Sequence, residues 1–148
     1  MNSNKNISNF GGAAKLDYSG IGMDSTDAKV LAELLKANIT VQCLHAQNNG
    51  LGPEGAKSFG SMLEHNSTLT LLDVSGNQMK AEGAAALADG LKSNSTVQQL
   101  DVSANGLGVD GGKAIAASIA ENSTITSVRS QKYAFVCPLF LTSFSLPP

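Results

Sequence analysis

The chain has 148 residues, of which 42% are hydrophobic and 15% charged, and its formal net charge at pH 7 is −2. This length suits one domain, and the hydrophobic fraction is enough to build a buried core. The sequence contains no cluster of Lys and Arg, and Arg129 is its only arginine. It therefore lacks the basic footprint that binding to nucleic acid or to an anionic membrane surface requires.

Residues 1–12 form a polar, asparagine-rich stretch, which we expect to be an N-terminal tail and not a signal peptide. No apolar run approaches the roughly 18 residues that a membrane-spanning helix needs. The two cysteines, Cys43 and Cys137, are too few for a disulfide framework. These features favour a reducing compartment, and we expect a cytoplasmic protein.

Leucines recur every 28 residues, at Leu16, Leu44, Leu72 and Leu100, and Val128 is the next step. A fixed period of this length is typical of stacked repeat units. We expect a repeat domain over residues 13–132. Its units are 16–43, 44–71, 72–99 and 100–127, with a partial unit 128–132.

Each unit has the pattern of a short strand followed by a helix. In the third unit, Leu72 and Val74 alternate with polar residues, as a half-buried strand requires. Ala84, Leu87 and Leu91 then recur at helical spacing. The same order in every unit predicts parallel strands that alternate with helices.

Acidic residues and asparagines mark the ends of the predicted helices. Glu54 (after Pro53), Glu82 and Asp110 stand near the helix starts, where negative charge suits the helix dipole. The helical patterns stop at Asn38, Asn66, Asn94 and Asn122. We expect these asparagines to close the helices in the left-handed conformation. Each also begins an Asn-x-Ser/Thr glycosylation sequence, but the recurrence at one structural position favours a structural role.

A second asparagine series, Asn49, Asn77 and Asn105, follows the predicted strands. From the end of the second unit into the third, the spacing is Leu69-x-x-Leu72-x-Val74-x-x-Asn77-x-Met79. The same spacing recurs one unit earlier, from Val41, and one unit later, from Val97. This spacing resembles the leucine-rich repeat consensus. The 28-residue period and alanine-rich helices are similar to the ribonuclease-inhibitor class of that family, as found in innate immune receptor repeat regions.

The resemblance implies an α/β solenoid, a short right-handed horseshoe with parallel strands on the concave face and helices on the convex face. An inward asparagine at Asn49, Asn77 and Asn105 would form a structural ladder. Its side chain can both donate and accept hydrogen bonds where the backbone leaves each strand without ladder partners.

Alternate strand residues should face the concave side, since side chains along a strand point to opposite faces. One column across the predicted sheet is Asp17, His45, Asp73, Asp101 and Arg129. We predict that this column is a partner-binding site. The alternative is that these are simply solvated polar residues.

The sequence contains few side-chain combinations that could support catalysis or hold a cofactor. Cys43 and His45 share the concave face, but no third group is evident to orient them as a nucleophile and base. Two Cys and two His are too few for a zinc site with the usual ligand spacing. No phosphate-binding loop occurs. We therefore expect no enzyme activity, metal or cofactor.

The resemblance implies a non-catalytic protein–protein interaction module or scaffold that binds another protein, without nucleic acid or membrane partners. Two alternatives remain open: an activator of a small GTPase, and a fragment of a larger repeat protein without autonomous activity.

The non-repeat tail 133–148 carries no charge and four of the seven aromatic residues. We predict that it is a makeshift cap on a shortened array and promotes self-association, with an evolved cap as the alternative.

Overall fold

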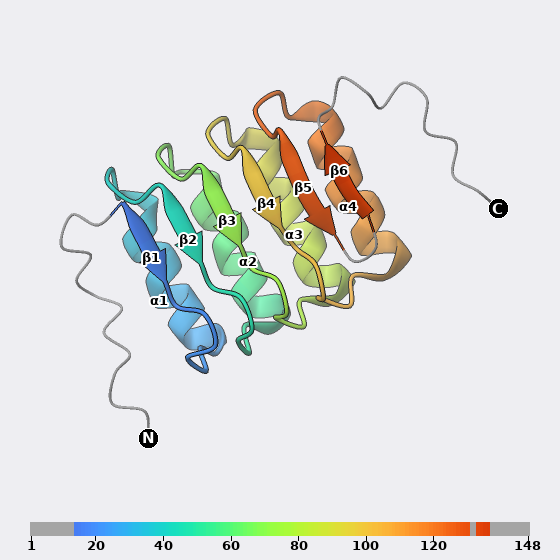
Figure 1. Ribbon diagram of the computed structural model, residues 1–148. Coiled ribbons are helices and arrows are strands. Elements are labelled where there is room, and N and C mark those ends of the chain that lie inside the picture. The colour runs from blue at the N-terminus through green and yellow to red at the C-terminus, as the bar shows by residue number, and fades with distance from the viewer. Residues whose placement is uncertain (1–13, 131–132, 137–148) are drawn as a thin grey trace.

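A computed structural model describes residues 14–130 and 133–136 (Figure 1). Strands and helices alternate along the chain. The elements are β1 (Lys15–Asp17), α1 (Ser25–Lys36), β2 (Cys43–His45), α2 (Gly52–Leu63), β3 (Leu71–Asp73), α3 (Lys80–Ser93), β4 (Gln99–Asp101), α4 (Gly108–Glu121), β5 (Ser127–Ser130) and β6 (Tyr133–Val136).

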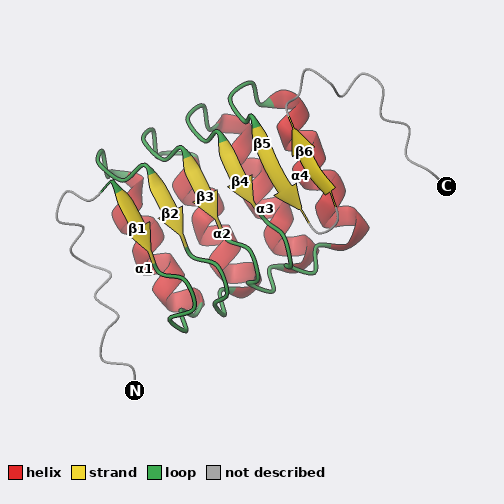
Figure 2. Cartoon of the chain, in the orientation of Figure 1, coloured by secondary structure: helices red, strands yellow, loops and turns green. Residues whose placement is uncertain are grey.

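The strands form one six-stranded sheet in the order β1 to β6. Strands β1 to β5 are parallel, and each leucine anchor pairs with the anchor 28 residues later, as Leu44 does with Leu72. The four helices cover one face of the sheet and leave the other face open (Figure 2). The predicted α/β solenoid is confirmed.

The core lies between the sheet and the helices. Leu44, Leu72, Phe59 and Leu87 are all fully buried there. Burying a leucine or phenylalanine side chain contributes about 1.5–3 kcal/mol. One strand and one helix cannot enclose their own apolar faces, so the stability of each unit depends on its neighbours.

Two glycines let helices α2 and α3 come into backbone contact. A Cβ added to Gly90 would lie 2.2 Å from the carbonyl oxygen of Gly60, and one added to Gly60 would lie 2.3 Å from that of Ala86. Real Cβ atoms essentially never approach a neighbour so closely. The spacing of these helices therefore requires glycine at both positions.

The acidic helix starts are confirmed at Glu54, Glu82 and Asp110, each in the first turn of its helix. Helix α1 begins differently, with a capping box that the sequence analysis missed. Asp24 Oδ1 accepts from the backbone N–H of Thr26 at 2.8 Å and of Asp27 at 3.0 Å. Asp27 Oδ2 accepts in return from the Asp24 N–H.

The expected left-handed helix closure at the NST asparagines is wrong. Asn94 and Asn122 end their helices with φ of −79° and −90°, which is extended backbone. The extended backbone places the asparagine side chain where it can link two consecutive units. Asn94 Nδ2 donates to the carbonyls of Leu63 and Asn66, and its Oδ1 accepts from the N–H of Val97 at 2.8 Å.

The second asparagine series is buried beside the strand ends. Asn77 Nδ2 donates to the carbonyls of Ala46 at 2.9 Å and Val74 at 3.0 Å, and its Oδ1 accepts from the Asn49 N–H at 3.1 Å. Asn105 repeats the arrangement one unit later, donating to Val74 and accepting from the Asn77 N–H. Each side chain thus joins two consecutive units.

The repeat pattern ends with a strand that runs the other way. Strand β6 pairs with β5 antiparallel, with Val128 opposite Phe135. The expected tail 1–12 and residues 137–148 of the expected apolar tail lie outside the described residues, so self-association stays a prediction. Within 14–130 and 133–136, no helix combines the length and apolar character needed to cross a membrane.

Candidate functional site on the concave face

The open face of the sheet carries the polar column. The strand register places Asp17 beside His45, His45 beside Asp73, Asp73 beside Asp101, and Asp101 beside Arg129. All five predicted residues therefore lie on neighbouring strands of one face. Their leucine neighbours at the intervening positions point into the core, as Leu44 and Leu72 show.

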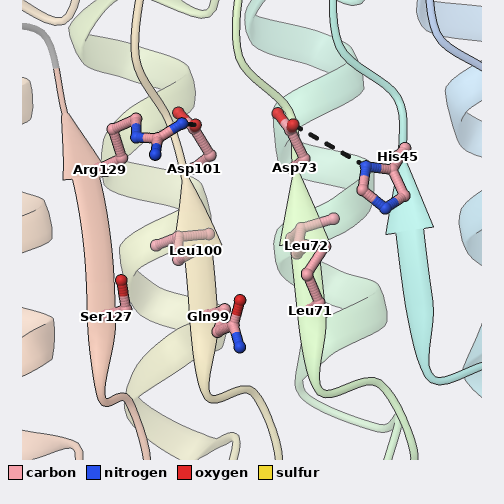
Figure 3. Close-up of a pocket in the computed structure, with 9 residues that line it drawn as sticks. All are labelled: His45, Leu71, Leu72, Asp73, Gln99, Leu100, Asp101, Ser127 and Arg129. Carbon is pink, nitrogen blue, oxygen red and sulfur yellow. Dashed lines mark hydrogen bonds and ion pairs between the residues drawn. The ribbon is translucent and has the colours of Figure 1, made fainter.

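Four of these residues border a hollow of about 160 Å³ (Figure 3). His45, Asp73, Asp101 and Arg129 lie at one end of the hollow. The row before them contributes Leu71, Gln99 and Ser127. Asp17 is not part of its lining. The hollow is thus centred on strands β3 and β4, in the middle of the sheet.

Serine residues fix the orientation of the aspartates. Asp73 Oδ1 accepts from the N–H and hydroxyl of Ser75 at 3.0 and 2.8 Å, and Asp101 Oδ1 accepts from those of Ser103 at 2.9 and 2.6 Å. This Asp-x-Ser arrangement was missed by the sequence analysis. The signal was available, because Asp-x-Ser occurs in three units at the same position.

The first unit repeats the arrangement with Asp17 and Ser19. Hydrogen bonds from the Ser19 hydroxyl and then from its N–H hold the pKa of the Asp17 carboxyl below its usual range. The positive charges of His45 and Lys15 act in the same direction. We call this pair of hydrogen bonds, from the hydroxyl and N–H of a serine to the aspartate two residues earlier, the serine clamp. At Asp17 the serine clamp favours the ionised carboxylate.

The second oxygen of each aspartate points toward a basic neighbour. Asp101 Oδ2 lies 3.3 Å from Arg129 Nη1, and Asp73 Oδ2 lies 4.0 Å from His45 Nδ1. The Asp73 and Asp101 side chains are 20% and 17% exposed, whereas Arg129 is 73% exposed. Two half-buried carboxylates therefore stand side by side, which is unfavourable without a cation nearby.

The second unit departs from the pattern. His45 and Gln47 stand where the first, third and fourth units carry Asp and Ser. Gln47 Oε1 is buried, and no group in the described part of the chain donates to it. The substitution therefore replaces a clamped carboxylate by a basic ring at the edge of the hollow.

Groups suited to catalysis or metal binding are sparse on this face. Cys43 is a half-buried free thiol on the same strand as His45. Across the part of the chain that the structure describes, no three His, Cys, Asp or Glu side chains gather as a metal site.

Three stretches of the chain, 37–60, 65–88 and 93–116, match the family described as Leucine Rich repeat. Their starts are 28 residues apart, the period of the sheet register. The chain is a leucine-rich repeat protein. No curated protein matches this sequence.

A protein of known structure has a similar fold. The solved structure of "Leiomodin-1 Actin-Binding Site 2 (ABS2)" superimposes with a TM-score of 0.74 and 21% sequence identity. The match covers 80% of this chain and 70% of that chain. At this identity the likeness concerns the fold alone.

Proposed function

We propose that this leucine-rich repeat chain is a non-catalytic protein-binding module whose partner lies on the concave face around His45, Asp73 and Asp101. The observation that carries the proposal is the stacked register, which gathers residues 28 apart in sequence at one hollow. The helices leave this face uncovered (Figure 2). A polar surface with fixed side-chain orientations loses little conformational entropy when a partner binds.

The helical face offers less to a charged partner, because several of its charges pair with one another. Lys57 contacts Glu54 at 2.7 Å and Glu82 at 2.8 Å, and Lys92 contacts Asp89 at 3.2 Å. These contacts are between exposed side chains. Recognition by charge is therefore better served by the aspartates of the concave face.

An apolar patch on α1 is the competing surface. Val30 and Leu34 are 45% and 39% exposed, whereas Met62, the equivalent of Leu34 in the next unit, is fully buried against the stack. Val30 and Leu34 belong to the flank of the array and not to its concave face. Val30 and Leu34 are therefore the second surface at which a partner could bind.

The proposal includes a scaffold role in the cytoplasm. Cys43 is free, as is usual in a reducing compartment. The side-chain amides of Asn66, Asn94 and Asn122 donate to buried carbonyls of the preceding unit. A glycan on any of these nitrogens would displace those bonds, so the fold suits a compartment without N-glycosylation. No comparison favours the alternative of a small-GTPase activator.

The test is affinity capture from cells with the full chain as bait. We expect Asp73→Lys/Asp101→Lys to lose the partners that the wild type retains, while its circular dichroism is unchanged. Asp89→Lys/Glu121→Lys makes the same change in net charge on the helices and should retain them. Partners that survive the concave double variant but are lost from Leu34→Ser would overturn the proposal in favour of the α1 flank.

A further inference from the structure

We infer that the partner presents a Lys or Arg side chain to Asp73, and that Arg129 competes with it by holding the neighbouring Asp101. This inference rests on the proposed function, because it concerns the same concave face. It identifies the chemistry of the contacting side chain, which the fold class leaves open.

The charges of the face point to a cationic ligand. Two of the three aspartates in the column, Asp73 and Asp101, line the hollow, and Asp101 already has the guanidinium of Arg129 as a partner. Asp73 is different. Within the described residues, its only basic partner at ion-pair distance is His45, at 4.0 Å. Of the two aspartates that line the hollow, Asp73 is therefore the one without a Lys or Arg partner.

The geometry of Asp73 suits one directed contact. Its Oδ1 already accepts two hydrogen bonds from Ser75, which leaves Oδ2 as the available acceptor. The side chain is 20% exposed, so it is accessible to a ligand yet less screened by water than a fully exposed carboxylate. A charge-assisted hydrogen bond from a partner's ammonium or guanidinium fits this oxygen.

Arg129 shows that a guanidinium can pair with an aspartate at the edge of the hollow. It reaches across from β5 to Asp101 Oδ2 on β4, and both residues line the hollow (Figure 3). Its side chain is 73% exposed, and pairs of this kind contribute little stability. A partner's cation can therefore displace Arg129 from Asp101 or bind beside it at Asp73.

The row below the aspartates provides an apolar contact. Leu71 lies two residues before Asp73 on the same face, where the other units carry Lys15, Cys43, Gln99 and Ser127. Leu71 is half-buried and lines the hollow. The aliphatic stem of a Lys or Arg, or a neighbouring apolar side chain of the partner, can pack on it. An acidic ligand would instead meet two adjacent carboxylates.

The inference is tested by NMR titration of the full chain with three blocked dipeptides: acetyl-Leu-Arg-amide, its citrulline counterpart, and acetyl-Leu-Glu-amide. Citrulline keeps the shape of arginine without its charge. We expect the arginine peptide to shift the backbone amides of Asp73 and Ser75 saturably, with much smaller effects from the other two. Equal binding of the arginine and citrulline peptides, or no shift with any peptide, would overturn the inference.

Two variants should change the affinity for the arginine peptide in opposite directions, which a loss of structure would not do. Asp73→Asn should weaken the arginine peptide at least about tenfold, because a hydrogen bond to a charged group is lost. Arg129→Gln should tighten it about twofold to fivefold, because an exposed competing pair is removed. Asp89→Asn, with the same charge change on α3, should leave it unaltered. A glutamate peptide that binds and is lost in Arg129→Gln would reverse the inferred charge.

The proposed function is judged separately. If the arginine peptide fails while the concave double variant still loses its partners in affinity capture, only the cationic chemistry is wrong. If the double variant retains all partners, the concave face itself is wrong.

Discussion

The backbone N–H of Asn49 donates to the side-chain Oδ1 of Asn77, one unit later, at 3.1 Å. Asn77 returns to the earlier unit through Nδ2, which donates to the carbonyl of Ala46. The same residue also donates to Val74 in its own unit. A single buried amide therefore satisfies backbone groups of two units, and stability should be concentrated at these positions.

We expect Asn77→Ala to destabilise the fold by about 1–3 kcal/mol, since it leaves buried backbone groups without partners. Asn77→Asp should also be destabilising, because the carboxylate accepts but cannot donate to Ala46 and Val74 unless it is protonated. Chemical denaturation measures both. Gln98→Ala, at an exposed position outside the left-handed backbone region, serves as the control. If Asn77→Ala is as stable as this control, the ladder does not hold the units together.

The contact between α2 and α3 gives a matched pair of glycine substitutions. Gly90→Ala places a Cβ 2.2 Å from the Gly60 carbonyl oxygen, so the helices must move apart. Overpacking of this kind costs about 1–3 kcal/mol. Gly112→Ala, in α4, meets nothing within 4 Å and should stabilise by roughly 0.5–1 kcal/mol through helix propensity. Thermal melting of the two variants should shift in opposite directions; a common sign would contradict the packing account.

The 28-residue period was enough to predict the sheet register and hence the column from Asp17 to Arg129. This worked because stacked units convert equal spacing in sequence into neighbouring positions in space. Orientation within the column was not predictable in the same way. The choice of Oδ2 over Oδ1 at Asp73 depends on a local turn with Ser75, which periodicity does not describe.

The helix ends show the opposite limitation. Asparagine is compatible with both left-handed and extended backbone, and local preference favoured the first at Asn94. The extended form prevails because it lets the side chain reach the carbonyls of Leu63 and Asn66 in the preceding unit. Strand β6 was likewise missed, since no repeat predicts an antiparallel partner for Val128. In both cases a contact distant in sequence or outside the repeat decided the structure, which the local pattern does not describe.

The C-terminal tail is expected to have two separable effects. A chain that ends at Lys132 loses β6 and exposes the edge of β5, so it should melt at a lower temperature than the full chain. The uncharged, aromatic-rich sequence 133–148 should nevertheless make the full chain self-associate more. Light scattering at several concentrations and thermal melting measure the two effects. A full chain that stays monomeric at high concentration, with a truncation that melts far lower, would identify the tail as an evolved cap.

The serine clamp at Asp17 has a pH signature. The folded pKa of this carboxyl is lowered chiefly by the hydrogen bonds from Ser19. Its contribution to stability is therefore present above the unfolded pKa of about 3.9, and it is lost as pH falls through the lower folded pKa. Ser19→Ala should raise the Asp17 pKa toward its usual range, as measured by NMR titration of the carboxyl carbon. An Asp17 pKa that is the same in both proteins would rule out the Ser19 hydroxyl as the main cause.

Lys80 stores backbone strain at the start of α3. Its φ is +57°, a left-handed conformation that costs a non-glycine residue roughly 1–2 kcal/mol. The equivalent positions in the second and fourth units are Gly52 and Gly108, with φ of +61° in both. We expect Lys80→Gly to stabilise the fold by up to about 1 kcal/mol, the remainder being offset by the greater freedom of glycine in the unfolded chain. Lys92→Gly, in the last turn of the same helix, is the control and should destabilise by up to about 1 kcal/mol. The denaturant midpoints of the two variants test this prediction. A midpoint for Lys80→Gly below that of the wild type would mean that contacts of the Lys80 side chain stabilise the fold by more than its backbone strain costs.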